Sequence, residues 1–177
     1  MDKKRNIVLI GMPAVGKSTV GILLAKKTGL SFLDTDILIQ TGEGKLLSEI
    51  IEERGAKGFM ALEQEYLCSV TVTDHVIATG GSAVYSGHGM EYLSKNGVVA
   101  YLETGLEHLK KRLSSLDSRG VIRSPGQDIS ALYHERTPLY ERYADLTVQC
   151  GTMTPDKVLS AMMTFNELPR LKERDDE

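Results

Sequence analysis

A glycine-rich motif near the start of the chain constrains its fold most strongly. Residues 11–18 read Gly-Met-Pro-Ala-Val-Gly-Lys-Ser and match the pattern G-x-x-x-x-G-K-[ST]. The motif follows an apolar run at 6–10, which predicts a buried strand, and it opens a segment with helical spacing that ends at Gly29. A strand, a glycine-rich turn and a helix in this order predict a loop that binds nucleotide phosphates.

Further apolar runs rich in Val, Ile and Leu predict the rest of the sheet. They lie at 75–78, 98–102 and 146–148, with a weaker run at 31–33. Segments with helical spacing separate them, one of which ends at Gly55. Continuous apolar runs are typical of parallel strands buried on both faces, so the alternation predicts an α/β fold with helices on both sides of the sheet.

Composition favours one domain with small-molecule partners. The 177 residues are 41% hydrophobic and 25% charged, as expected for a single globular domain over residues 1–177. A net charge of −3, without any cluster of Lys and Arg, argues against a nucleic-acid or membrane-surface partner. The apolar run after the basic start is broken by Gly and Pro, so we expect no signal segment and a cytoplasmic protein, as a monomer.

Two local compositions stand apart from the regular alternation. Residues 112–128 are rich in Ser, Asp, Gly and Pro and carry Arg112, Arg119 and Arg123, which indicates a mobile lid. Residues 167–177 form a charged tail to which we assign no chemistry. Cys68 and Cys150 lack neighbours at metal-ligand spacing, so neither a zinc site nor a disulfide framework is indicated.

Each part of the glycine-rich motif is expected to make a different contact with ATP and Mg²⁺. Backbone N–H groups and the start of the helix suit phosphate oxygens, and the glycines permit close approach. Lys17 is expected to reach the β- and γ-phosphates, and the Ser18 hydroxyl to enter the shell of Mg²⁺, which prefers oxygen. The expected nucleotide contacts from this segment are Gly11, Ala14, Val15, Gly16, Lys17, Ser18 and Thr19, of which Thr19 also suits helix packing.

Two acids follow the weaker strand, in the sequence Asp34-Thr35-Asp36. They lie at the carboxyl end of that strand, where open parallel sheets bind their ligands. One carboxylate is suited to Mg²⁺, and the other to accepting a hydrogen bond from an attacking hydroxyl. The alternative is that these acids cap the following helix, which Asp-Thr-Asp also suits.

These residues, together with several other segments, resemble those of the shikimate kinases. That family uses ATP to phosphorylate the 3-hydroxyl of shikimate in aromatic amino-acid biosynthesis. The resemblance covers nearly the whole chain and rests on Arg5-Asn6-Ile7, Asp34-Thr35-Asp36, Ala78-Thr79-Gly80-Gly81, Tyr101-Leu102-Glu103-Thr104, and Arg136-Thr137-Pro138-Leu139-Tyr140 with Ala144-Asp145 behind it.

The resemblance implies a fold and a set of roles. The fold is a three-layer P-loop NTPase fold with a five-stranded parallel sheet, a lid and a substrate-binding helical region. Asp34 would serve Mg²⁺, and Asp36 would bind and orient the substrate hydroxyls. Gly80 and Gly81 would contact the substrate. Arg136 would pair with its carboxylate, Arg119 would stabilise the transferring phosphate as a catalytic group, and Arg112 would lie against the adenine.

The chain departs from the family at the acceptor side. Shikimate kinases carry Phe-Arg-x-x-Glu, where this chain reads Phe59-Met60-Ala61-Leu62-Glu63. Replacing the arginine removes charge-assisted hydrogen bonds worth about 1.5–3 kcal/mol each, although Lys57 lies one turn away. Ser82 stands where a third glycine is usual, and Arg119 is followed by Gly-Val-Ile instead of Pro-Leu-Leu.

The sequence therefore leaves more than one function open. Phosphorylation of shikimate is the first reading, and another hydroxyl metabolite such as homoserine is the second, because an amino group would suit Glu63. A nucleotide-binding module without catalysis is a further alternative. A nucleoside monophosphate kinase is the rival enzyme on this architecture, but a second phosphate would call for arginines where the acids stand.

Overall fold

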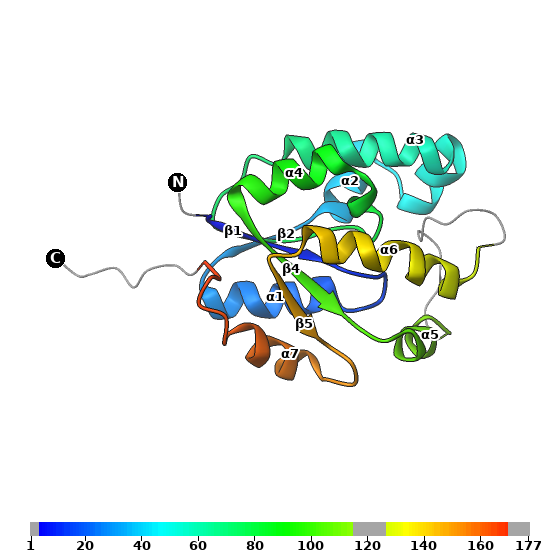
Figure 1. The fold of residues 1–177 in the computed structure, drawn as a ribbon. Coiled ribbons are helices and arrows are strands. Elements are labelled where there is room, and N and C mark those ends of the chain that lie inside the picture. Colours follow the sequence, from blue (N-terminus) through cyan, green and yellow to red (C-terminus); the bar gives the residue numbers. More distant parts are fainter. Residues whose placement is uncertain (1–3, 115–126, 170–177) are drawn as a thin grey trace.

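A five-stranded parallel sheet forms the centre of the computed structural model, which describes residues 4–114 and 127–169. The strand order is β2-β3-β1-β4-β5, and all pairs are parallel (Figure 1). The strands are β1 (Asn6–Ile10), β2 (Ser31–Asp34), β3 (His75–Ala78), β4 (Gly97–Glu103) and β5 (Leu146–Gln149). Every predicted strand is present, and β1 and β3 have the predicted bounds, so the α/β fold class is confirmed.

Helices connect the strands as crossovers. They are α1 (Lys17–Thr28), α2 (Thr35–Glu43), α3 (Leu47–Ser69), α4 (Gly87–Asn96), α5 (Leu106–Ser114), α6 (Ile129–Tyr143) and α7 (Pro155–Met162), with a 3-10 turn at Ala83–Tyr85. Gly29 ends α1 in the left-handed conformation, as predicted. Gly55 has φ 67° and kinks α3, but the helix resumes beyond it up to Ser69.

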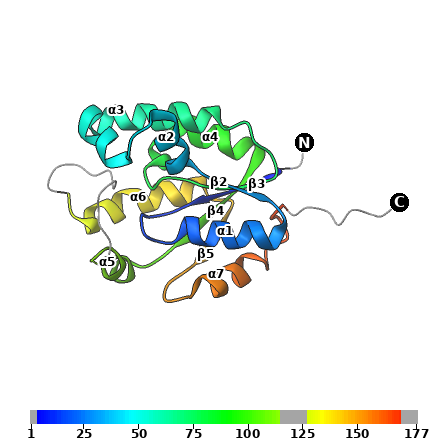
Figure 2. The same cartoon turned by 180° about the vertical axis from the view of Figure 1, so that it is seen from behind.

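The two faces of the sheet carry separate cores. On one face, Ile7 and Leu9 of β1 pack against α1 and α7; on the other, Val8 and Ile10 pack against α3, α4 and α6. Figures 1 and 2 show α1 and α7 on one side of the sheet and α3, α4 and α6 on the other. A third small core joins α2 to α3 through Ile39 and Phe59. This arrangement leaves the carboxyl ends of the strands at one edge, where the loops gather.

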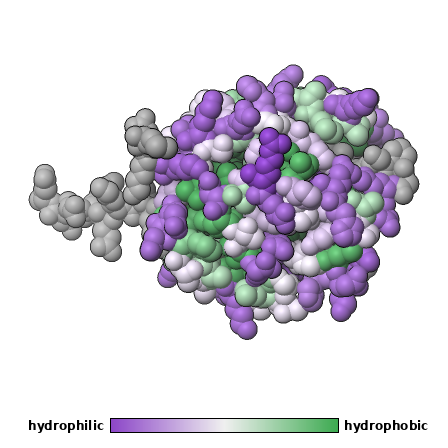
Figure 3. All heavy atoms as spheres, in the orientation of Figure 1, coloured by the Kyte–Doolittle hydropathy of each residue, from purple (hydrophilic) through white to green (hydrophobic). Residues whose placement is uncertain are grey.

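The surface mixes polar and apolar side chains. Figure 3 shows hydrophilic side chains over much of one face, with smaller hydrophobic areas between them. Within the described ranges, each helix is too short or too polar to cross a membrane. The lid predicted at 112–128 lies largely outside the described residues, as does the tail beyond residue 169.

Candidate active site

The glycine-rich motif forms a tight loop between β1 and α1. Gly16 has φ 103° and open space beside it, while Ala14 also takes a positive φ of 65°. Gly11 has φ 143°, and a Cβ there would lie 2.6 Å from the carbonyl oxygen of Leu102. Gly11 is therefore required by the close approach of the loop to β4, whereas Gly16 supplies the backbone turn that opens α1.

Lys17 lies at the start of α1 with its ammonium group held by the loop. Its Nζ donates hydrogen bonds to the carbonyl oxygens of Gly11 at 2.8 Å and Met12 at 3.0 Å. Burial lowers the pKa of Lys17 to about 8, although the nearby carboxylate of Asp36 acts in the opposite direction. The side chain is thus a buried cation at the mouth of the loop, where phosphate oxygens would displace weaker carbonyl partners.

Ser18 and Asp34 bring two hard oxygens together. The Ser18 hydroxyl donates to Oδ2 of Asp34 at 2.6 Å, while Oδ1 of Asp34 accepts from the N–H groups of Asp36 at 2.9 Å and Ile37 at 3.4 Å. Asp34 therefore caps α2 and also faces the loop, so the two interpretations of this acid are compatible. A hydroxyl and a carboxylate fit the oxygen preference of Mg²⁺. The described part of the chain gathers no group of three or more His, Cys, Asp or Glu side chains suited to a metal.

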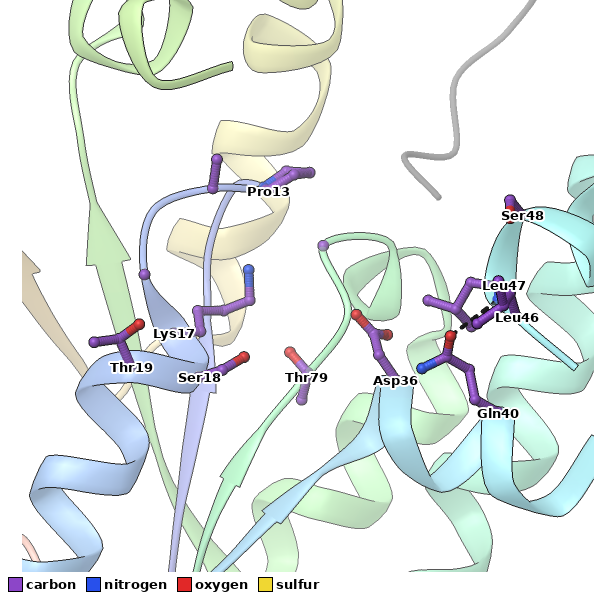
Figure 4. A pocket seen from close by; sticks show the side chains of 13 residues that line it. Pro13, Lys17, Ser18, Thr19, Asp36, Gln40, Leu46, Leu47, Ser48 and Thr79 are labelled. Carbon is purple, nitrogen blue, oxygen red and sulfur yellow. Dashed lines mark hydrogen bonds between the residues drawn. The ribbon is translucent and has the colours of Figure 1, made fainter. Parts of the chain in front are cut away.

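One large cleft joins the phosphate loop to the acidic side. Its volume is about 770 Å³. In Figure 4, Lys17 and Ser18 lie on one side, Asp36 and Gln40 of α2 lie opposite, and Thr79 lies between them. Gly81 also lines it, as do Leu46, Leu47 and Ser48 at the start of α3. The loop and the acidic side are thus two walls of a single cavity.

Asp36 projects from the first turn of α2 into this cleft. Burial raises the pKa of Asp36 to about 6, and the charge of Asp34 raises it further, while Lys17 lowers it. A Cβ on Gly80 would lie 2.7 Å from Oδ1 of Asp36, so this glycine gives the carboxylate its room. The arrangement places a carboxylate across the cleft from the phosphate loop.

Glu63 of α3 lies behind Gly80 and is only 1% exposed. A Cβ on Gly80 would lie 2.6 Å from Oε1 of Glu63, and this oxygen has no hydrogen-bond partner among the described residues. Burial raises the pKa of Glu63 to about 7, whereas a hydrogen bond from Ser82 acts the other way. The glutamate belongs to the same polar region as Asp36, Arg136 and Lys17, whose charges all act on it.

Arg136 is buried beside Gly81, with 1% exposure. It projects from α6, and its Nε donates to the hydroxyl of Tyr85 at 3.1 Å, with the guanidinium lying over the Tyr85 ring. A Cβ on Gly81 would lie 3.1 Å from Nη1 of Arg136 and 2.9 Å from the Pro13 ring. Gly81 therefore lets the guanidinium approach the cleft.

Arg112 lies on the other side of the phosphate loop. Its Nη1 donates to the carbonyl oxygens of Val15 at 2.8 Å and Ala14 at 3.5 Å. A smaller cavity of about 120 Å³ lies here, lined by Val15, Gly16, Thr19, Val20, Arg112, Cys150, Met153, Pro155 and Val158. Burial raises the pKa of Cys150 to about 11, so this thiol stays protonated. A mostly apolar cavity beside the loop has the character of a base-binding site.

The structure brings most of the predicted site residues into one region. Lys17, Ser18, Asp36 and Gly81 line the large cleft, and Thr19 and Arg112 line the smaller cavity. Asp34 is hydrogen-bonded to Ser18, and Gly80 and Arg136 lie beside Asp36 and Gly81. Arg119 lies outside the described residues. Lys57 is exposed on α3.

Three further residues belong to the region although the predicted site omitted them. Glu63 carries a signal in the sequence, since it lies one helical turn after Met60. Gln40 carried another, because it follows Asp36 by one helical turn and shares its face. Tyr85 had no signal in the sequence; only the fold brings its hydroxyl to Arg136.

The fold and the site define a class. The phosphate loop, with its lysine and serine, is set on a parallel sheet and faces a carboxylate across one cleft. This arrangement defines a P-loop phosphotransferase. The family model of shikimate kinase matches residues 13–166. The chain belongs to the shikimate kinase family and is a phosphotransferase with an alcohol group as acceptor.

Individual relatives agree with this assignment. A shikimate kinase of Vibrio vulnificus is 35% identical over 176 residues, covering 98% of this chain and 99% of that protein. One from Thermodesulfovibrio yellowstonii is 36% identical over 157 residues, covering 87% and 90%. Among solved structures, a shikimate kinase from Acinetobacter baumannii in complex with shikimate superimposes with a TM-score of 0.81 at 31% identity, covering 90% of this chain and 92% of that one.

Proposed function

We propose that this protein transfers the γ-phosphate of ATP to a hydroxyl of shikimate, yielding shikimate 3-phosphate. The observation that carries the proposal is the cleft in which the phosphate loop faces Asp36, with Gly81 in its lining and Arg136 beside Gly81. Donor and acceptor groups there share one cavity, so transfer needs no migration of the phosphate between sites. The relative from Acinetobacter baumannii, solved with shikimate, supports this acceptor.

The donor side of the proposal uses the loop and its neighbours. The backbone N–H groups around Gly16 would hold the phosphates, Lys17 would neutralise the β- and γ-oxygens, and Ser18 and Asp34 would hold Mg²⁺. Mg²⁺ supplies charge neutralisation for the phosphates when bound. The base would lie in the smaller cavity beside Thr19 and Arg112. Arg119, which lies outside the described residues, would stabilise the transferring phosphate.

The acceptor side uses the opposite wall. Asp36 accepts a hydrogen bond from the attacking hydroxyl and orients its oxygen toward the γ-phosphorus, with Gly80 and Gly81 leaving room for the substrate. Arg136 pairs with the carboxylate in bidentate fashion. The new P–O bond forms as the bond from the γ-phosphorus to the bridging oxygen breaks, the hydroxyl proton passes to Asp36, and ADP leaves with the bridging oxygen. The protein is proposed to act in the cytoplasm as a monomer.

A coupled ADP-release assay tests the proposal. Purified protein with ATP, Mg²⁺ and shikimate should release ADP well above the rate without acceptor, and Lys17→Met should remove that difference. AMP and CMP serve as competing acceptors, since their turnover in place of shikimate would indicate a nucleoside monophosphate kinase. If ADP binds but every acceptor leaves the rate unchanged, the chain is a nucleotide-binding module and the proposal is wrong.

A further inference from the structure

The side chains of Glu63 and Asp36 lie against the α-carbon of Gly80, and the place where these two acids meet is called the niche below. Two carboxylate oxygens border it, because the position of a Gly80 Cβ lies 2.6 Å from Oε1 of Glu63 and 2.7 Å from Oδ1 of Asp36. Glu63 is 1% exposed, and its Oε1 has no hydrogen-bond partner in the described part of the chain. A buried carboxylate oxygen without a partner is costly, so the niche calls for a hydrogen-bond donor.

Charges around the niche favour a cationic donor. With ATP and Mg²⁺ bound, the proposed function commits Lys17 to the phosphates and Asp34 to the metal. Among the residues that the structure describes, the buried cation left to the carboxylates of Asp36 and Glu63 is then Arg136. An acceptor bearing a carboxylate alone adds a further negative charge beside these two acids, whereas one that also bears an ammonium offsets that charge.

The helix that carries Glu63 supplies no cation of its own to this place. Met60 lies one turn before Glu63 on α3 and packs against the apolar cluster of Ile39, Ile50, Phe59 and Leu62. Lys57, a turn further back, is exposed. Arg54 forms its ion pair with Glu43 at the surface. The positive group that completes the niche is therefore best supplied by the ligand.

We infer that Glu63 is a specificity-determining residue that selects an ammonium group on the acceptor, so that hydroxylated α-amino acids are phosphorylated in addition to shikimate. The acceptor's ammonium lies between Glu63 and Asp36, and its carboxylate pairs with Arg136. The inference rests on the proposed function, because it requires phosphate transfer to a hydroxyl at this cleft. Its atoms balance as in that reaction: the acceptor oxygen gains the phosphoryl group, and ADP leaves.

Two acceptors that differ only in the amino group give the first test. L-Homoserine and 4-hydroxybutyrate have the same chain, carboxylate and terminal hydroxyl, but only L-homoserine carries an ammonium. With the wild-type protein, kcat/KM should be about tenfold or more higher for L-homoserine, as expected for a charge-assisted hydrogen bond in a buried site. Equal values for the two compounds would overturn the inference.

Variants of α3 give the second test. Glu63→Gln should bring the two kcat/KM values within about threefold of each other. Met60→Arg should also bring the two kcat/KM values together, because the new arginine offers Glu63 an internal partner one turn away. Glu65→Gln is the matched control, because Glu65 is exposed on the same helix and should leave the preference unchanged. A preference unaltered by both Glu63→Gln and Met60→Arg would contradict the inference.

The outcomes separate the two proposals. Turnover of shikimate with no turnover of L-homoserine overturns the inference and leaves the proposed function standing. Absence of turnover with every acceptor, despite nucleotide binding, overturns the proposed function itself. Thermal denaturation of each variant shows whether it is folded, and the comparison of ligands needs no variant.

Discussion

The hydroxyl of Ser18 and the carboxylate of Asp34 are joined by a hydrogen bond of 2.6 Å, which ties the start of α1 to the start of α2. The second oxygen of Asp34 caps α2 at the same time. One side chain therefore fixes the acidic wall of the cleft to the phosphate loop. A cation bound to these two oxygens would take the place of the hydrogen bond between Ser18 and Asp34.

The two duties of Asp34 are separable by substitution. Asp34→Asn keeps an oxygen for the cap and loses the negative charge, so the Mg²⁺ concentration for half-maximal activity should rise about tenfold with little loss of stability. Asp34→Ala should also lower the free energy of unfolding by about 1 kcal/mol. Mg²⁺ titrations of ADP release and urea denaturation measure the two effects. Unchanged Mg²⁺ dependence in Asp34→Asn would remove this residue from the metal site.

A side chain at Gly80 should impair use of the acceptor but not binding of the nucleotide. A Cβ would meet carboxylate oxygens of Glu63 and Asp36 at 2.6 and 2.7 Å. Gly80→Ala should therefore lower kcat/KM for the acceptor at least tenfold, while ADP affinity measured by calorimetry stays within about threefold. Gly87→Ala is the control, since its Cβ would meet only the Tyr143 hydroxyl at an ordinary 3.5 Å. Equal effects of the two substitutions would contradict this role.

Glu63 should make stability depend on pH. Its folded-state pKa of about 7 lies above its ordinary value of 4.5, because burial disfavours the ionised form. The unfolded chain loses this proton at lower pH than the folded protein, so stability falls as pH rises between these values and the penalty is constant above them. At 1.36 kcal/mol per pH unit, the penalty reaches roughly 3 kcal/mol.

Replacing Glu63 removes that dependence. Glu63→Gln keeps an oxygen for Ser82 and should be more stable than wild type by about 1–3 kcal/mol at pH 8, with a smaller difference at pH 5. Urea denaturation at the two pH values checks this. A gain of stability that is the same at both pH values would contradict the assignment.

Arg112 should support the nucleotide through the loop. Its guanidinium donates to the Val15 carbonyl at 2.8 Å and lines the smaller cavity. Arg112→Ala should weaken ADP binding about fivefold to tenfold in calorimetry, because a charge-assisted hydrogen bond is lost. Lys110→Ala on the same helix should change nothing, since Lys110 pairs with Glu107 at the surface. Identical affinities for the two variants would contradict the prediction.

Local sequence signals predicted the fold and the phosphate-loop side of the site. The runs at 6–10 and 75–78 gave strands with the observed bounds, because a buried parallel strand needs an unbroken apolar stretch. The loop of residues 11–18 placed Lys17 and Ser18, since its backbone geometry is specified by its own glycines. The break at Gly55 was predicted, but the resumption of α3 depends on packing against α2 and α4, which short-range patterns do not encode.

The rest of the site depends on contacts between distant segments. Arg136 meets Tyr85 and approaches Gly81 only because α6 packs against the loop after β3. The orphaned oxygen of Glu63 likewise depends on the position of Gly80, which lies on another element. Arg119 remains a prediction, since it lies outside the described residues.

Phosphorus NMR of a reaction with ATP, Mg²⁺ and shikimate tests most directly whether the cleft joins donor and acceptor. We predict that the γ-phosphate signal is replaced by a phosphomonoester signal in step with ADP formation, and that neither change occurs with Lys17→Met. Release of inorganic phosphate alone, at a rate that is the same with and without shikimate, would contradict the account.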